Sequence, residues 1–294
     1  MIVVRLRGGL GNQMFQYATA RRAALVNHWP LKLDTSAFEP GTRRAYGLQD
    51  FRILGTIATA AELAEITGPP HGVGKRVHRI RRRFKIGYRW TWIQESCLAP
   101  VNPFVLAASA YSYLDGYWQT EKYFADVGDT IRREFTIASW ADRRAEAVAG
   151  EIAALESVSI HVRRGDYVSH LPTNQAHGTC TLDYYHEAVR RMSARLSRPH
   201  FFVFSDDPEW VAANLRLDHP TTLVSGLLTG NQYDDLRLMS LCRHHIIANS
   251  SFSWWGAWLN PRPDKVVIAP RQWGNDPSWD DRDLLPESWI TVER

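Results

Sequence analysis

The stretch SVSIHVRRGDYV, residues Ser157–Val168, passes from an alternating apolar run into two adjacent arginines and a Gly-Asp pair. Alternation over Val158–Val162 predicts a strand buried in a sheet. Successive side chains on a strand point to opposite faces, so His161 and Arg163 should share one face. The stretch therefore predicts a buried strand whose end carries fixed positive charge.

Strands and helices alternate on both sides of this stretch, with short loops between them. That order is typical of parallel sheets covered by helices. Two such halves predict an α/β enzyme of two Rossmann-type domains, residues 1–154 and 155–294, that face each other across a cleft. The predicted strands are Ile2–Leu6, Leu31–Leu33, Tyr111–Leu114, Val158–Val162, Phe201–Phe204, Thr222–Val224, His245–Ala248 and Lys265–Ala269. The predicted helices are Phe15–Val26, Ala58–Thr67, Ala141–Ala154, Leu182–Leu196, one beginning at Pro208, Asp234–Cys242 and Phe252–Leu259.

Three polar clusters follow strands of the second half. HVRRGD follows the first of these strands, FSDD the second and NSSFSWW the fourth. Ligands of open parallel sheets bind outside the carboxyl ends of the strands, so the three clusters should meet at one edge. Each cluster alone is equally well explained as a helix cap. The candidate ligand-binding residues in these clusters are His161, Arg163, Arg164, Asp206, Asn249, Ser250 and Ser251.

The chemistry of these clusters suits a diphosphate. The planar fork of an arginine binds phosphate oxygens with two parallel hydrogen bonds. Ser250 and Ser251 open a predicted helix, whose free N–H groups and positive dipole end favour an anion. The alternative is that Arg163 and Arg164 only form ion pairs with Asp166 and other acids.

The loop GGLGNQ, residues 8–13, follows a strand and opens a helix, as a dinucleotide-binding fingerprint does. Asp34 at the end of the next strand would complete an NAD site. The third glycine of the fingerprint is Met14, however, which would obstruct close packing of helix and strand. We therefore favour a role for the glycines in bringing the backbone and Asn12 close to a ligand shared across the cleft. An NAD-dependent oxidoreductase remains the much weaker alternative.

Charge is concentrated in one segment. The chain has 35 basic and 31 acidic residues, and eight of the cations lie between Lys75 and Arg89 with no acid among them. The rest of the chain is acidic on balance, which argues against a nucleic-acid-binding protein. Val73, Val77, Ile80 and Phe84 follow one another at spacings of four, three and four residues, which predicts a basic amphipathic helical insertion near residues 71–92. Such a helix is either a solvated flank of the core or a contact with an anionic membrane surface through residues 75–89.

Several classes of protein are disfavoured. No apolar run is long enough to span a membrane, and MIVVRLRGG is not a secretory signal. Three widely spaced cysteines predict a reducing compartment and no zinc cage. We expect a cytoplasmic protein, with attachment to the inner membrane face as the variant that the basic segment suggests. Asp206 and Asp207 are explained as a strand-end turn and a helix cap, so no metal site and no cofactor are expected.

Five motifs together carry a family resemblance. They are GGLGNQMFQYA (Gly8–Ala18), HVRRGDYV (His161–Val168), HGTCTLDYY (His177–Tyr185), FSDDPEW (Phe204–Trp210) and DLRLMSLCRHHIIANSSFSWWGAWL (Asp235–Leu259). In this order they resemble the α-1,2-fucosyltransferases of glycosyltransferase family 11. The resemblance runs through most of the chain but leaves residues 55–110 uncovered.

The resemblance implies a GT-B fold, with the acceptor bound mainly by the first domain and GDP-β-L-fucose by the second. It implies metal-independent transfer of fucose, with inversion, to O2 of a terminal galactose of a glycan. Arg163 would hold the β-phosphate with support from Arg164, and the two serines of the last motif would bind the diphosphate. His161 and Asp235 would address the guanosine. A fucosyltransferase of another linkage is the alternative within this resemblance.

Asp166 has two interpretations. It lies three residues after Arg163 and is a candidate for the base that accepts the proton of the attacking hydroxyl. Neighbouring arginines should lower its pKa and weaken it as a base. The other interpretation, which we favour slightly, is that Asp166 fixes Arg164 through an ion pair and that the reaction needs no strong base.

Overall fold

The computed structural model describes residues 1–38, 41–42, 44–68, 72–85, 87–95, 100–137 and 139–294. Residue 71, at the start of the expected basic insertion, and Ile86 within it lie outside the described residues, as does Cys97. The chain divides into two compact units, Met1–Thr136 and Ile137–Arg294. The predicted boundary lay at residue 154. It falls earlier because α6 (Arg143–Ala154) packs against β6 (Glu156–Val162) and α11 (Gln232–Leu241) of the second unit.

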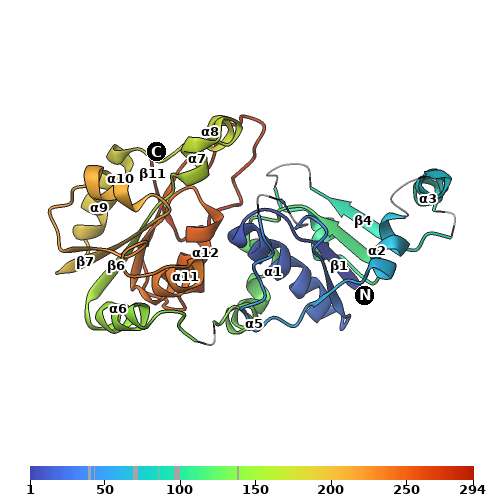
Figure 1. Cartoon of the computed structure of the whole chain (residues 1–294), viewed down its shortest axis with the longest axis horizontal. Coiled ribbons are helices and arrows are strands. Elements are labelled where there is room, and N and C mark those ends of the chain that lie inside the picture. Colours follow the sequence, from blue (N-terminus) through green and yellow to red (C-terminus); the bar gives the residue numbers. More distant parts are fainter. Residues whose placement is uncertain (39–40, 43, 69–71, 86, 96–99, 138) are drawn as a thin grey trace. The chain divides into compact units, whose positions relative to one another are not determined.

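The first unit is built on a parallel sheet. Its described strands have the order β3-β2-β1-β5-β4, with β1 between β2 and β5. The strands are β1 (Ile2–Arg5), β2 (Leu31–Asp34), β3 (Thr56–Ile57), β4 (Thr91–Gln94) and β5 (Ser112–Asp115). The helices are α1 (Leu10–Val26), α2 (Ala60–Thr67), α3 (Gly72–Phe84), α4 (Pro103–Leu106), η1 (Glu121–Tyr123), η2 (Ala125–Val127) and α5 (Gly128–Glu134) (Figure 1).

Helix α1 begins at Leu10, five residues before the predicted start and within the GGLGNQ segment. Gly8 has a φ of +81°, a left-handed conformation that favours glycine, and a Cβ there would lie 2.6 Å from Asn12 Nδ2. Met14 is fully buried within α1, in the position where a dinucleotide fingerprint has glycine. Asp34 is 2% exposed and accepts a 2.5 Å hydrogen bond from Tyr113 Oη. A buried carboxylate with this partner does not suit a ribose, which argues against the NAD alternative.

The second unit is the more regular one. Its described strands form a parallel sheet of order β11-β10-β9-β6-β7-β8, with helices on both faces (Figure 1). The further strands are β7 (Pro199–Ser205), β8 (Thr221–Leu223), β9 (His244–Ile246), β10 (Val267–Pro270) and β11 (Ile290–Val292). The further helices are α7 (Gly165–Ser169), α8 (Leu171–His177), α9 (Leu182–Ser193), α10 (Pro208–Asn214) and α12 (Ser251–Leu259).

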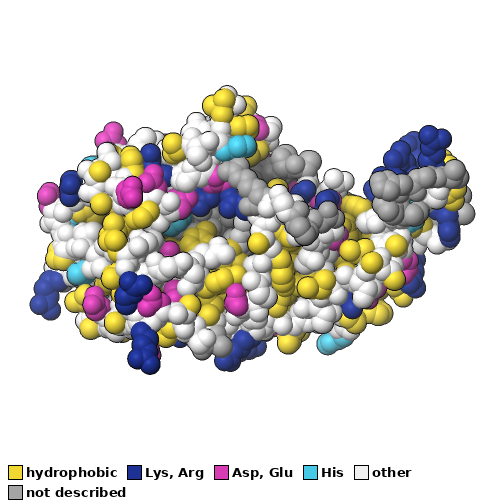
Figure 2. Space-filling model, viewed as in Figure 1, with side chains coloured by type: hydrophobic (Ala, Val, Ile, Leu, Met, Phe, Trp, Pro, Cys, Tyr) yellow, Lys and Arg dark blue, Asp and Glu magenta, His cyan; other side chains and the backbone are white. Residues whose placement is uncertain are grey.

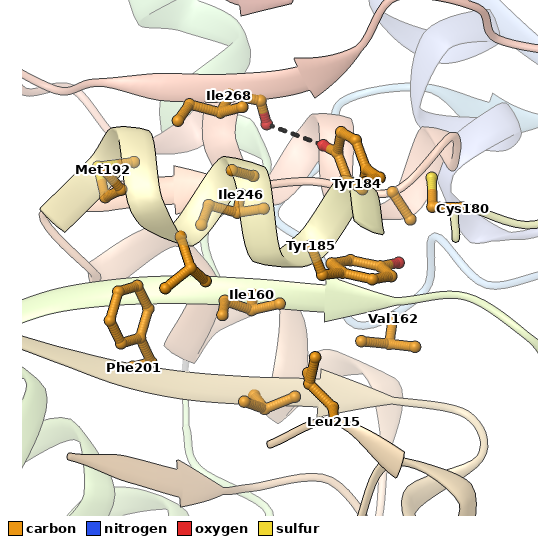
Figure 3. Close-up of a cluster of buried hydrophobic side chains, with 14 of the residues drawn as sticks. Ile160, Val162, Cys180, Tyr184, Tyr185, Met192, Phe201, Leu215, Ile246 and Ile268 are labelled. Carbon is orange, nitrogen blue, oxygen red and sulfur yellow. Dashed lines mark hydrogen bonds between the residues drawn. The ribbon is translucent and has the colours of Figure 1, made fainter. Parts of the chain in front are cut away.

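The two faces of β6 have different partners. Ile160 and Val162 belong to a buried apolar cluster with Tyr184, Tyr185 and other residues of α9 (Figure 3). His161 points to the other face, where its ring centroid lies 5.7 Å from that of Phe252 in α12. This alternation is the one that the sequence predicts. It fixes which side chains of β6 reach the polar edge of the sheet.

Candidate functional site

The register of the sheet brings two of the polar clusters together. Val162 of β6 pairs with Ser205 of β7, and both strands end at these residues. The next residues, Arg163 and Asp206, are therefore neighbours at the carboxyl edge. Arg163 Nη1 lies 2.7 Å from Asp206 Oδ2, and Asp206 Oδ1 accepts a 2.8 Å hydrogen bond from the backbone N–H of Arg164.

The guanidinium of Arg163 is held on several sides. Nη2 forms an ion pair with Asp166 Oδ1, and the group lies over the Tyr167 ring, 5.1 Å from its centroid. The side chain is 20% exposed. Its Nε is buried and has no hydrogen-bond partner among the described residues. A buried donor without a partner is costly, so it marks a place where a ligand acceptor would stabilise the site.

Arg164 is fixed separately. Its Nε lies 3.1 Å from Asp207 Oδ2, and its guanidinium stacks over the Trp210 ring at 3.8 Å from the centroid. The expected ion pair between Asp166 and Arg164 is therefore wrong, because α7 begins at Gly165 and turns Asp166 back toward Arg163. Both partners of Arg164 come from the FSDDPEW motif, in which the sequence analysis interpreted Asp207 as a helix cap and did not single out Trp210.

His161 is a neutral residue at this edge. Burial, with a smaller contribution from the charge of Arg163, lowers its pKa to about 3. Its side chain is almost fully buried, and Nδ1 has no partner among the described residues. His161 near the end of β6 and Arg163 just beyond it thus each present an unsatisfied nitrogen at this edge.

Asp235 is linked to the same edge through hydroxyl groups. Ser225 Oγ accepts from the backbone N–H of Ser205 at 3.0 Å and donates to Asp235 Oδ2 at 2.7 Å. Thr229 Oγ1 donates to the other carboxylate oxygen. Burial raises the pKa of Asp235, while the two hydroxyls oppose that shift. A half-buried carboxylate of this kind can still accept hydrogen bonds from a ligand through its remaining lone pairs.

The third cluster lies where β9 leads into α12. Ser250 is the N-cap of α12, and its side chain makes no capping hydrogen bond. Ser251 opens the helix and is half-buried. The first N–H groups of a helix lack intrahelical partners, so this terminus suits an anion.

Two predicted ligand-binding residues have internal partners instead. Asn249 is fully buried, and its Nδ2 donates to the backbone oxygens of His177, Gly178 and Trp273 at 3.0–3.2 Å. Its side chain therefore supports the loops around the edge and is corrected from a ligand contact to a structural role. Asn12 belongs to the first unit, where its Oδ1 accepts a 2.7 Å hydrogen bond from Gln119 Nε2.

Sequence reasoning missed two aromatic residues of this site, Tyr167 and His177. The rings stack with centroids 4.8 Å apart and an interplanar angle of 17°. Burial lowers the pKa of His177, and its Nδ1 has no partner among the described residues. The motif HGTCTLDYY begins at His177, so the motif itself was the available signal.

A second polar cluster lies at the carboxyl ends of β1, β5 and β4 of the first unit. Arg5 Nη1 and Arg7 Nη1 lie 3.4 and 3.6 Å from the two oxygens of Asp115. Glu95 is buried and accepts hydrogen bonds from the backbone N–H groups of Tyr117 and Trp118. Burial raises the pKa of Glu95. Across the described residues of both units, no group of three His, Cys, Asp or Glu side chains is placed to hold a metal ion.

Known proteins are similar to this chain over most of its length. The model of glycosyl transferase family 11 matches residues 99–293. The α-1,2-colitosyltransferase of Escherichia coli is 33% identical over 296 residues, covering 100% of this chain and 99% of that protein. The O-antigen biosynthesis glycosyltransferase WbnK of Escherichia coli is 31% identical, with 98% and 99% covered. Galactoside 2-alpha-L-fucosyltransferase Sec1 of Mus musculus is 25% identical, with 94% and 69% covered.

Solved structures show the same fold. NodZ α-1,6-fucosyltransferase, in a crystal soaked with GDP-fucose, superposes with a TM-score of 0.50 and 16% identity, covering 92% of this chain and 94% of that one. The two α/β units with parallel sheets have the architecture of the GT-B fold, as the sequence resemblance implies. None of the helices in the described part of the chain is long and apolar enough to cross a membrane.

Proposed function

Because the chain belongs to glycosyltransferase family 11, we propose that it transfers L-fucose from GDP-β-L-fucose to O2 of a terminal galactose, with inversion. The names of the similar proteins support the linkage, since both the colitosyl- and fucosyltransferases carry an α-1,2 or 2-alpha designation. The choice of donor is supported by the structure of the same fold that was soaked with GDP-fucose. It is also supported by the second unit, where the arginines and the N-terminus of α12 suit a diphosphate.

The observation that carries this proposal is the state of Arg163. Two carboxylates fix its guanidinium, and its buried Nε has no partner among the described residues. In the proposed reaction Arg163 binds the β-phosphate, and Arg164 adds positive charge beside it. A cation fixed before the reaction stabilises the charge that develops on the departing GDP without a reorganisation cost.

The remaining proposed contacts with the donor involve residues at the carboxyl edge of the second unit's sheet. The N-terminus of α12, with Ser250 and Ser251, would bind the diphosphate through its free N–H groups and hydroxyls. His161 and Asp235 would contact the guanosine, where a carboxylate can accept hydrogen bonds from the N–H groups of the base. Asp206 acts through Arg163 and the Arg164 N–H and is a positioning residue.

The proton of the attacking hydroxyl must leave during transfer. Asp166 forms an ion pair with Arg163 and so helps to fix that guanidinium. We therefore assign Asp166 to positioning of Arg163, with a dissociative transition state that needs no strong base. The polar cluster of the first unit, with Arg7, Asp115 and Glu95, is the proposed side for the galactose acceptor.

We propose that the transfer is independent of metal ions. Arg163 and Arg164 would supply the charge that a divalent cation supplies in other enzymes with phosphate leaving groups. Addition of EDTA should leave the rate nearly unchanged, whereas a large loss restored by magnesium or manganese would contradict this part of the proposal.

Transfer of colitose is the second candidate function, because a colitosyltransferase is among the most similar relatives. Colitose is fucose without its 3-hydroxyl group. A site built to hydrogen-bond that hydroxyl would reject the deoxy sugar strongly, by roughly 10⁴-fold, whereas a site without such a contact would discriminate only weakly.

A donor competition experiment tests both functions. The protein is incubated with a β-galactoside and equal concentrations of GDP-fucose, GDP-colitose, GDP-mannose and UDP-galactose, and the product is analysed by mass and by linkage. We expect fucose at O2 of galactose. Preferred transfer of colitose would select the second candidate, and transfer from UDP-galactose alone would overturn both.

A further inference from the structure

Helix α3 turns its apolar side chains toward solvent. Val77, Ile80 and Phe84 are 49%, 53% and 64% exposed, and their spacing of three and four residues places them on one face. In a globular protein the apolar stripe of a surface helix normally faces the core. The orientation of α3 is therefore reversed.

The opposite face attaches α3 to the first unit. His78 Nε2 lies 2.9 Å from the backbone oxygen of Ile66, and the ring packs edge-on against Tyr88. One turn later, the guanidinium of Arg82 stacks over the Trp92 ring at 3.8 Å from its centroid. These contacts fix which face of the helix points outward.

A basic stripe lies beside the apolar one. Arg76, Arg79 and Arg83 each directly precede one of the three apolar residues, so they follow the same helical spacing. All three are exposed and make no hydrogen bond or ion pair with the described residues. Lys and Arg side chains gather over this helix in the space-filling view (Figure 2).

We propose that the outward face of α3 binds the surface of an anionic lipid bilayer. A planar partner contacts only one face of a helix, and here the other face is already attached to the protein. An apolar stripe beside a basic stripe matches the boundary between acyl chains and anionic headgroups. A nucleic acid would use the cations but would leave the apolar stripe exposed. The proposal does not depend on which sugar the enzyme transfers.

Two variants of the full chain separate the two stripes. The first replaces Val77, Ile80 and Phe84 with serine, and the second replaces Arg76, Arg79 and Arg83 with glutamate. A control replaces three exposed arginines of the second unit with glutamate and so changes the net charge by the same amount: Arg143, Arg195 and Arg216. Circular dichroism and transfer to a soluble acceptor check that each variant is folded.

The measurement is co-sedimentation with vesicles of phosphatidylcholine alone or mixed with phosphatidylglycerol. We expect the wild type and the control to bind only the anionic vesicles. Each cation near an anionic surface contributes about 1 kcal/mol, which is about a five-fold change in the partition coefficient. Loss of three cations in the glutamate variant should therefore lower the partition coefficient by roughly 100-fold or more. The serine variant should lose about 10-fold or more.

Three results would overturn the proposal. The first is a wild type that fails to bind anionic vesicles or binds neutral ones equally well. The second is a serine variant or a glutamate variant that binds as the wild type does, or a control that loses as much. The third is a dimer in light scattering that the serine variant converts to a monomer without any vesicle binding, which would assign the stripe to a second copy of the chain.

Discussion

Gly165 is the residue on which the position of the two arginines depends. A Cβ at this position would lie 2.3 Å from Asp206 Oδ2, so any other residue would displace that carboxylate. Asp206 holds both the Arg163 guanidinium and the Arg164 backbone N–H. The glycine therefore allows the start of α7 to approach Asp206 closely.

Replacing Gly165 with alanine should weaken GDP binding by about 10-fold or more, because one charge-assisted contact of Arg163 is lost or distorted. Calorimetric titration with GDP measures the change. Gly150→Ala is the matched control: Gly150 lies in α6 with nothing within 4 Å of the added Cβ. That variant should bind GDP normally and gain about 0.5–1 kcal/mol in unfolding free energy. Unchanged GDP affinity in Gly165→Ala would mean that Asp206 does not position Arg163 for the donor.

At the scale of elements, α12 has an unusual start. A serine N-cap normally accepts a hydrogen bond from the helix backbone and contributes about 1 kcal/mol. Ser250 makes no such bond, although it is buried at the sheet edge. Thr59 at the start of α2, in contrast, accepts from the Glu62 backbone N–H at 3.2 Å as part of a capping box. The hydroxyl of Ser250 is thus not committed to the stability of its helix.

Because Thr59 caps its helix and Ser250 does not, replacing each with alanine should affect stability and GDP binding differently. Ser250→Ala should change the free energy of unfolding by less than about 0.5 kcal/mol yet lower the affinity for GDP several-fold. Thr59→Ala should cost about 1 kcal/mol in stability and leave GDP affinity unchanged. Urea unfolding and calorimetric titration measure the two quantities. A Ser250→Ala protein that is clearly less stable but binds GDP normally would assign Ser250 to capping alone.

At the scale of the whole molecule, buried histidines link stability to pH. Burial lowers the pKa of His161 to about 3 and that of His245 well below its usual value. Below about pH 6.5 the unfolded chain protonates these residues while the folded chain keeps them neutral. The unfolded state then binds more protons, so stability decreases as the pH falls from about 6.5 toward 3.

At pH 5 His161 should lower the free energy of unfolding by about 2 kcal/mol relative to pH 7.5, and His245 should add to this decrease. Urea unfolding at the two pH values measures the sum. His161→Gln should reduce the difference between the two values by about 2 kcal/mol. Equal stability of the wild type at pH 7.5 and pH 5 would show that the histidines are not kept neutral by burial.

The sequence by itself determined the α/β class, most of the strands and helices of the second half, and the family. These features depend on local patterns: alternation along Val158–Val162, the Asp207–Pro208 helix start, and motifs that occur in a fixed order. It also determined that polar clusters follow three strands of one parallel sheet. The carboxyl ends of parallel strands lie at one edge of the sheet, so these patterns predict a candidate site at that edge.

Only the tertiary structure decided which partners these residues have. The pairing of Val162 with Ser205 places Arg163 beside Asp206. Helix α7 begins at Gly165 and turns Asp166 toward Arg163, with which it forms an ion pair. The sequence also did not predict that Asn249 is buried or that the apolar side chains of α3 face solvent. Register between strands and the face on which a helix docks depend on contacts between residues far apart in the chain, so local sequence patterns alone do not fix them.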